Sequence, residues 1–310
     1  MSAITNKLAE FVMVVFAATL LTYFLTWLSP GDPAQIYFEA RGVSPSEEAL
    51  REMQVAMGLD KPFIVQYLDW VKGILTLDAG HSLKTGEPVA DMVTHRMGMT
   101  FKLAACAIVL VVLFAMLFGV VGSLLRESAG ELVLRLLAFI AISIPDFWLG
   151  LMLIIGFVVN LNWFKITDPY AASSIVLPAL TLALPLIGRY TRQIQSMIQE
   201  EMSKEYVVGA RARGTKESTI ILHHVLPSVL GGLTTLFGLS CALLLGGTVV
   251  VESIFSWPGL GRMALEAITF RDYPVLQAYV VIMVIIYMSV SLLADLVAAL
   301  LDPRLSKQGQ

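Results

Sequence analysis

EYVVGARARGTKESTIILHHVLP, residues 205–227, is a polar and basic stretch set between two long apolar runs. A membrane protein that keeps such a segment at its cytoplasmic face typically offers it to a soluble partner. Two helices are predicted here, Glu205–Arg213 and Lys216–Leu226. Gly214 suits the left-handed position that closes the first helix, Thr215 can cap the second, and the final proline is expected to end it. An ordinary positively charged loop is the alternative, but the Gly–Pro punctuation and the small residues at the tip favour a docking element.

The composition excludes an ordinary soluble domain. Of 310 residues, 57% are hydrophobic and only 15% are charged, and the charges are gathered in a few blocks. The net charge of -3 gives no reason to expect nucleic acid as a partner. Cys106 and Cys241 both lie in apolar runs and are interpreted as small apolar residues rather than a disulfide or a metal-binding pair.

Six stretches with few or no charges reach or approach the ~20 residues that a helix needs to cross ~30 Å of hydrocarbon. The first is interpreted as an uncleaved anchor, because its apolar run is too long for a signal peptide and ends in SPGDP. The predicted fold is therefore an all-α membrane protein, a single domain over residues 1–310. The spans are placed at about residues 9–30, 100–125, 134–162, 172–198, 226–252 and 274–300.

Lysine and arginine set the orientation of the spans. If both termini are cytoplasmic, the two short outer loops hold only Lys165, Arg262 and Arg271. The inner segments then hold Lys7, Arg126, Arg135, Arg189, Arg192, Lys204, Arg211, Arg213, Lys216, Arg304 and Lys307. Residues 203–227 are accordingly predicted to be cytoplasmic, and residues 29–98 extracytoplasmic.

The predicted outer segment, residues 29–98, has a helical pattern of its own. A capped helix is expected between Ser44 and Gly58, and a second, amphipathic helix over Phe63–Leu75. Two interpretations stay open, and they are compatible. The segment is either a lid on its own membrane domain or a docking surface for an extracytoplasmic partner.

Prolines and charges inside the spans are candidates for a solute path. Pro145, Pro178 and Pro185 each remove a helical hydrogen bond and favour a bend, although proline is also simply common in membrane helices. Asp146 follows the first of these prolines. A charge at membrane depth is costly, so this carboxylate is a functional candidate that would attract a cationic solute. A local bond to freed backbone donors or to Ser143 is the alternative.

Glu252, near the outer end of the fifth span, is a candidate for an outer gate, with Arg262 or Arg271 as partners. The segment between Ser253 and Pro274 is expected to form a rigid outer loop that frames or plugs the path.

Two other chemistries are rejected on the sequence. Residues 209–215 have the glycine spacing of a phosphate loop, but no lysine follows the second glycine and no strand precedes the first. Nucleotide binding at these residues is therefore rejected. His223 and His224 are adjacent, so on a helix their side chains point ~100° apart, and no cysteine or carboxylate shares their face. His81 and His95 have no ligand spacing either.

The stretch 205–227 resembles the EAA loop of binding-protein-dependent ABC importer permeases. In that loop a glycine is followed nine residues later by I-x-L-P, and Ala210, Gly214, Leu226 and Pro227 match. The departures at Val208, Gly209 and His224 are typical of the dipeptide/oligopeptide/nickel branch, whose Y-V-x-x-A-R-A-x-G is similar to residues 206–214. Further matches in order are GDPA (31–34), GLDKPFIVQYLDW (58–70), SIPDFWLG (143–150), LPALTLALP (177–185), GGTVVVESIFSWPGLGRMALEAITFRDYPVLQ (246–277) and LLDPRL (300–305).

The resemblance implies the type I importer permease fold, six spans in the bacterial inner membrane and a role without catalysis. It implies that the chain pairs with a second, paralogous permease above two ATPase subunits, and that an extracytoplasmic binding protein delivers the solute. This chain would bind no cofactor, and ATP and Mg would bind the ATPase subunits. The loop around Gly214 would be the coupling helix. Residues that this assigns to ATPase coupling are Glu205, Tyr206, Ala210, Arg211, Arg213, Gly214, Thr215, Leu226 and Pro227; Pro145, Asp146 and Glu252 are assigned to the path.

The favoured solute is nickel or a metal chelate, because the segment between Gln35 and Glu48 resembles nickel-type permeases and these often have a polar residue at the position of Asp146. A dipeptide or oligopeptide is the alternative. Two rivals come from other classes. A self-powered secondary transporter would require paired intramembrane carboxylates or repeated broken helices, and a membrane scaffold gives no reason for a proline-bent bundle.

Overall fold

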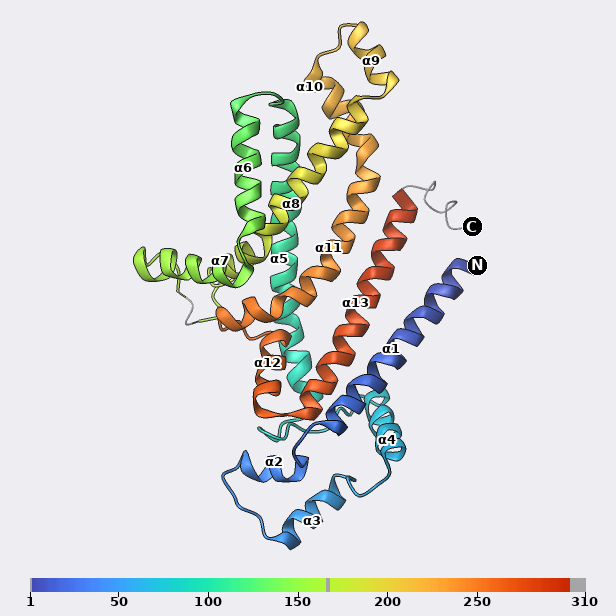
Figure 1. Cartoon of the computed structure of the whole chain (residues 1–310), viewed down its shortest axis with the longest axis vertical. Coiled ribbons are helices and arrows are strands. Elements are labelled where there is room, and N and C mark those ends of the chain that lie inside the picture. The colour runs from blue at the N-terminus through green and yellow to red at the C-terminus, as the bar shows by residue number, and fades with distance from the viewer. Residues whose placement is uncertain (1, 166–167, 302–310) are drawn as a thin grey trace. The chain divides into compact units, whose positions relative to one another are not determined.

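The computed structural model describes residues 2–165 and 168–301 (Figure 1). Within these residues the regular elements are helices, and His81 and Pro88 form one isolated β-bridge. The elements are α1 (Ser2–Leu28), α2 (Pro33–Glu39), α3 (Glu47–Ala56), α4 (Phe63–Leu75), α5 (Val89–Leu124), α6 (Ala129–Ser143), α7 (Asp146–Leu153), the π-helix η1 (Ile154–Asn160), α8 (Val176–Met202), α9 (Glu205–Ala212), α10 (Glu217–Ile220), the π-helix η2 (Ile221–Val225), α11 (Leu226–Ile254), α12 (Leu260–Phe270) and α13 (Tyr273–Leu301).

These elements form two compact units. Unit 1 comprises Met1–Thr100 and Pro258–Ser289, and unit 2 comprises Phe101–Trp257 and Val290–Gln310. The helices α5 and α13 each contribute residues to both units.

By length and composition, three helices of the described residues can cross a membrane: Lys7–Leu28, Val89–Leu124 and Tyr273–Ala294. A fourth candidate is the pair formed by Ala129–Ser143 and Asp146–Asn160, which is bent by 104°. In α8 the apolar first half is followed by a polar second half that carries Arg189, Arg192 and Glu200. In α11, 29 residues long, several side chains near the middle lie outside the described part of the chain. The count of six spans therefore stays a prediction.

The third predicted span, residues 134–162, is not one helix but two. The helix α6 ends at Ser143, and the backbone is extended at Ile144 (φ -86°, ψ 125°) and at Pro145 (ψ 140°) before α7 begins. Proline disfavours the helical conformation of the residue before it, which explains the break at Ile144. The expected bend at Pro145 is confirmed, and it is sharper than a kink.

The second span is longer than predicted. The helix α5 begins at Val89, well before residue 100, because Val89 and Val93 are buried against α12 and α13 within unit 1. The prediction of a loop over residues 253–274 is wrong in part, since this segment contains the eleven-residue helix α12. The closing residues 302–310, with Arg304 and Lys307 and most of the LLDPRL motif, lie outside the described residues.

The helices predicted within residues 29–98 are confirmed. The hydroxyl of Ser46 accepts a hydrogen bond from the Ala49 amide (3.2 Å) at the start of α3, and Gly58, with φ +70°, follows its end. The helix α4 has the predicted bounds, Phe63–Leu75.

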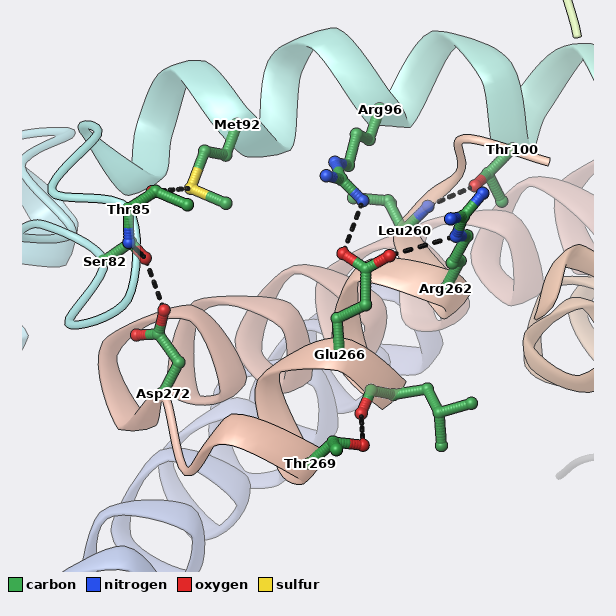
Figure 2. A network of polar contacts seen from close by, with 11 residues as sticks. Ser82, Thr85, Met92, Arg96, Thr100, Leu260, Arg262, Glu266, Thr269 and Asp272 are labelled. Carbon is green, nitrogen blue, oxygen red and sulfur yellow. Dashed lines mark hydrogen bonds and ion pairs between the residues drawn. The ribbon is translucent and has the colours of Figure 1, made fainter. Parts of the chain in front are cut away.

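Polar contacts fasten the loop before α5 and the start of α5 to α12 and its end (Figure 2). The buried carboxylate of Asp272 accepts hydrogen bonds from the Ser82 hydroxyl and from the Leu83 amide (3.0 Å). Glu266 pairs with Arg96 on α5 (3.6 Å) and with Arg262 one turn away (3.0 Å). The expected gate partner Arg262 is therefore engaged with a carboxylate of its own helix.

Unit 2 is held by close helix crossings at small residues. A Cβ on Gly188 of α8 would lie 2.8 Å from the Ala138 carbonyl oxygen of α6, and one on Gly119 of α5 would lie 2.6 Å from Ile194 of α8. Small residues let membrane helices approach closely enough to gain van der Waals contact, so α8 lies tightly between its neighbours. The two cysteines, Cys106 and Cys241, are free thiols in half-buried positions.

Candidate coupling loop and polar cleft

The loop between α8 and α11 closes its first helix with a complete Schellman motif. Gly214 has φ +77°, and its amide donates to the carbonyl of Arg211 (2.9 Å). The amide of Thr215 donates to the carbonyl of Ala210 (3.2 Å). These two bonds satisfy carbonyls that the end of α9 would otherwise leave open. The prediction that Gly214 occupies the left-handed position is confirmed.

A bidentate ion pair joins α9 to α10 across this turn. The Arg211 Nε and Nη2 atoms donate to the two carboxylate oxygens of Glu217, at 2.5 and 3.2 Å. The hydrogen bond from Glu217 raises the pKa of the Arg211 guanidinium above its ordinary value. Both side chains are exposed, so the pair contributes little stability by itself. Its two-point geometry fixes the angle between the helices.

The inner side of the loop packs into the core of unit 2. Val207 and Ile220 are fully buried, and Ala210 is 3% exposed, in one cluster with Ile194 and Ile198 of α8. Ala210 is therefore a packing residue that seats α9 on α8, and its side chain is not on the outer surface of the loop.

The outer side of the loop carries a mixed apolar and basic surface. Exposed there are the apolar side chains of Tyr206, Val208 and Leu222, next to Arg211 and Arg213. Nothing lies within 4 Å of where a Gly214 Cβ would be, so the tip of the turn is open. A slim tip with basic and apolar neighbours suits insertion into an acidic groove of another protein.

Tyr206 is held at the base of this surface. Its hydroxyl donates to a Glu201 carboxylate oxygen (3.1 Å), and Glu201 also pairs with Lys204 (2.7 Å). Burial, and secondarily the bond to Glu201, raise the pKa of Tyr206, while a bond to Ser228 opposes the shift. Tyr206 therefore keeps its proton at neutral pH and acts as a neutral donor.

Two details of the loop differ from the sequence prediction. The N-cap of α10 is Lys216, not Thr215, and it makes no side-chain cap bond. Pro227 does not end a helix either, because α10, η2 and α11 follow one another without a break. Pro227 has no amide hydrogen for the carbonyl four residues before it. The π-turn accommodates this, since the Leu226 amide donates to the carbonyl of Ile221, five residues back.

The remaining loop residues are placed as follows. Glu205 begins α9 and is exposed, Leu226 is half-buried at the core, and Pro227 is exposed. The exposed imidazoles of His223 and His224 lie on η2. Among the described residues, no group of three histidine, cysteine or carboxylate side chains is arranged to hold a metal ion.

A second polar feature is a cleft at the break between α6 and α7. Its volume is about 520 Å³, which falls within the range of small-molecule sites. Asp146, the first residue of α7, lines it, and Arg189 of α8 lines it too and acts electrostatically on this carboxylate. The remaining lining residues are mainly apolar and come from α6, α8 and α11. The Ser143 hydroxyl donates to the Phe139 carbonyl (2.7 Å), which does not support the alternative of a local bond between Ser143 and Asp146.

Of the other two predicted path residues, one lines this cleft and one is buried. Pro145 lines the cleft beside Asp146. Glu252, near the end of α11, is fully buried, so its carboxylate is enclosed by this chain and does not lie on an open surface.

Sequence reasoning missed two residues. Glu217 is not singled out by the sequence analysis, although its six-residue separation from Arg211 across a glycine turn is a signal for pairing. Arg189 was counted among the inner charges, and its position one turn after Pro185 could have indicated a residue that faces the cleft.

Comparisons with known proteins cover nearly the whole chain. Residues 111–307 match the family described as "Binding-protein-dependent transport system inner membrane component", and residues 1–104 match the corresponding N-terminal family. A putative peptide transport system permease protein of Brucella suis biovar 1 (strain 1330) is 34% identical over 309 residues, covering 97% of this chain and 98% of the relative. The metal-staphylopine import system permease protein of Staphylococcus aureus (strain Mu50) is 32% identical over 303 residues, covering 97% of each chain.

A solved structure shares the fold. A chain of the MetNI methionine ABC transporter, in an inward-facing conformation, superposes with a TM-score of 0.55 at 16% sequence identity. The match covers 68% of this chain and 96% of that chain.

Proposed function

Because this chain belongs to the family of binding-protein-dependent transport system inner membrane components, we propose that it forms half of a solute path and receives an ATPase subunit at the loop 203–227. It is a multi-pass protein of the bacterial inner membrane and a permease of the ABC importer class. In the proposed assembly a second permease completes the path, two ATPase subunits hydrolyse ATP with Mg, and an extracytoplasmic binding protein delivers solute.

The observation that carries the docking proposal is the rigid construction of the loop around Gly214. The Schellman motif, the Arg211–Glu217 pair and the buried inner side hold the tip in one conformation while leaving it open to a partner. A preorganised tip loses little conformational freedom when it docks. In the proposal, Tyr206, Arg213 and Thr215 contact the ATPase groove, whereas Ala210 and Leu226 seat the loop on the core.

Solute passes, in the proposal, along the cleft that contains Asp146. The carboxylate lies at the N-terminal end of α7, and Arg189, which lines the same cleft, offers the opposite charge. A solute with both charges would find a partner for each. Glu252 belongs to this path only if the assembly opens the region that encloses it in the single chain.

The names of the relatives support peptides and metal chelates as the proposed solute classes. One relative is named for peptide transport and the other for metal–staphylopine import, at nearly equal identity. We favour a metal chelate, with a dipeptide or oligopeptide as the alternative. The delivering binding protein supplies most of the selectivity in either case.

Reconstitution tests the proposal. The chain is placed in proteoliposomes with its partner permease, ATPase subunits and binding protein, and uptake of a labelled nickel chelate and of a labelled dipeptide is measured. Uptake that requires both ATP and the binding protein is expected, and uptake driven by an ion gradient without ATP would reject the proposal. The preferred solute decides between the two classes.

Two substitutions test the site assignments. Gly214→Arg adds a bulky side chain to an open tip, so insertion should be normal while co-purification of the ATPase is lost; recovery of the ATPase at the wild-type yield would contradict the docking role. Asp146→Asn should reduce uptake at limiting solute, and Asp91→Asn, on the exposed first turn of α5, is its matched control. Equal uptake by both variants would remove Asp146 from the path.

A further inference from the structure

The extracytoplasmic helix α4 packs along the last turns of the first span (Figure 1). The hydroxyls of Tyr67 and Thr19 are hydrogen-bonded (3.1 Å). The ring of Tyr23 contacts those of Phe63 (5.8 Å between centroids) and Trp70 (5.2 Å). One face of α4 is thus occupied by α1, over the part of α1 between Thr19 and Leu28.

This contact places α4 at membrane depth. The apolar span is Lys7–Leu28, 22 residues, and a crossing needs ~20, so its last turns cannot rise far out of the hydrocarbon. Tyr23 lies five residues before Leu28, which corresponds to ~7 Å at 1.5 Å per residue. Helices that lie in a membrane interface are buried by ~5–10 Å. The height of α4 on α1 is therefore that of an interfacial helix, and the aromatic residues between them are typical of this zone.

A second apolar face of α4 has no partner in unit 1. Ile64, Leu68 and Leu75 recur at helical spacing and are 67%, 58% and 79% exposed, and the half-buried Val71 lies between them. The helix α1 beside it is open as well, since only 6% of its span window is buried by the rest of the chain. At this depth, a helix packed on so open a span has its free apolar side at the level of the lipid.

The polar residues of α4 are segregated to the opposite side. Gln66 and Asp69 line a cleft of about 1060 Å³, and Lys61 forms an ion pair with Asp69 (2.8 Å). Lys72 is exposed on the edge between the two sides, one turn from Leu68. This separation of an apolar and a polar side is typical of a helix that lies in the plane of a bilayer surface.

We propose that α4 lies in the plane of the membrane, with Ile64, Leu68 and Leu75 inserted among the acyl chains of the leaflet that holds the end of α1. This is the outer leaflet in the proposed orientation. The helix would anchor the extracytoplasmic segment to the bilayer, and its polar side would keep the adjoining cleft open to water. The proposal rests on α1 being a membrane span and not on the transport activity.

Spin labels test the proposal on the full chain in phospholipid nanodiscs. Cys106 and Cys241 are first replaced by serine, and a nitroxide is attached at Leu68→Cys or, as the control on the polar side, at Asp69→Cys. Collision rates with oxygen, which partitions into lipid, and with water-soluble chromium oxalate are then compared. The ratio of the oxygen rate to the oxalate rate is expected to be higher at position 68 than at position 69.

Two results would overturn the proposal. A label at position 68 that collides mainly with the oxalate lies in water, and one that neither reagent reaches is covered by protein. Leu75→Cys, the most exposed of the three positions, repeats the measurement if the first variant does not fold. Insertion is supported if labels at positions 68 and 75 both collide mainly with oxygen and the label at position 69 collides mainly with the oxalate.

Discussion

Replacing Gly214 by alanine should loosen the coupling loop by a calculable amount. The residue has φ +77°, where an L-residue with a Cβ costs roughly 1–2 kcal/mol, and there is no steric clash to add, because nothing lies within 4 Å of the new Cβ. The cost therefore comes from backbone conformation alone. It corresponds to a roughly 5–30-fold increase in the opened fraction of the turn.

Hydrogen exchange measures this opening directly. The amides of Gly214 and Thr215 donate the two Schellman bonds, so peptides that cover residues 205–217 should exchange faster by about that factor. Gly209→Ala is the matched control, since it makes the same chemical change within the helix α9. There the new Cβ would lie 3.7 Å from the Arg213 guanidinium, an ordinary contact, and alanine favours the helix by ~1 kcal/mol.

The two variants should therefore shift exchange in opposite directions. The exchange rate of Gly214→Asn should lie between those of Gly214→Ala and the wild type, because asparagine tolerates the left-handed region better than alanine. Exchange in Gly214→Ala that is equal to or slower than the wild type would refute the reasoning. ATP-dependent uptake should fall in Gly214→Ala and not in Gly209→Ala.

Three further predictions concern the rest of the molecule. Asp272→Asn replaces the carboxylate that accepts the hydrogen bonds from the loop before α5, and should destabilise that loop by ~1–3 kcal/mol. Limited proteolysis should then cleave the loop faster than in the wild type, and an unchanged cleavage rate would contradict this prediction. Gly188→Val forces a Cβ to within 2.8 Å of an α6 carbonyl and should lower the thermal midpoint of the purified chain by the equivalent of ~1–3 kcal/mol. Gly246→Ala, in the interior of α11 with no atom within 4 Å of the new Cβ, should not lower it, because alanine favours the helix. Lys61, by its hydrogen bond and its charge, holds the pKa of Asp69 below its usual range, so the pairing is complete at neutral pH and is lost as the pH falls through the lowered pKa of Asp69. Exchange of the α4 amides should accelerate only when the pH falls below the ordinary range of an aspartate carboxyl, and Asp69→Asn should abolish that dependence.

The sequence predicts the local elements well where a signal is contained within a few residues. The bounds of α4 follow from its apolar periodicity, and the end of α9 follows from one glycine, because each depends on backbone preference and on a single contact face. The break at Ile144 is also local, and the rule for residues before proline would have given it without any tertiary information. The bend was expected there, but not a separate helix at 104°.

What the sequence could not give depends on contacts between distant segments. The early start of α5 at Val89 requires the buried face that α12 provides, and that helix was itself expected to be a loop. The place of Arg189 at the cleft depends on how α8 crosses α6 at Gly188, which no periodicity reveals. The buried position of Ala210 likewise follows from the packing of α9 on α8.

The course of the chain through Pro227 bears on how a docked partner would act on the path. Since α10, η2 and α11 are continuous, the loop is attached to α11 by a helix and not by a flexible hinge, and its other end leads back into α8 within a few residues. The same two helices line the cleft, α8 through Arg189 and α11 through Leu244. The buried inner side of the loop shares one apolar cluster with both helices, so a displacement of α9 and α10 must either move α8 and α11 or open that cluster. Opening a well-packed apolar cluster is costly, so the rigid route is favoured. If ATPase subunits dock at this loop as proposed, their closure would therefore change the width of the cleft without contact with the solute.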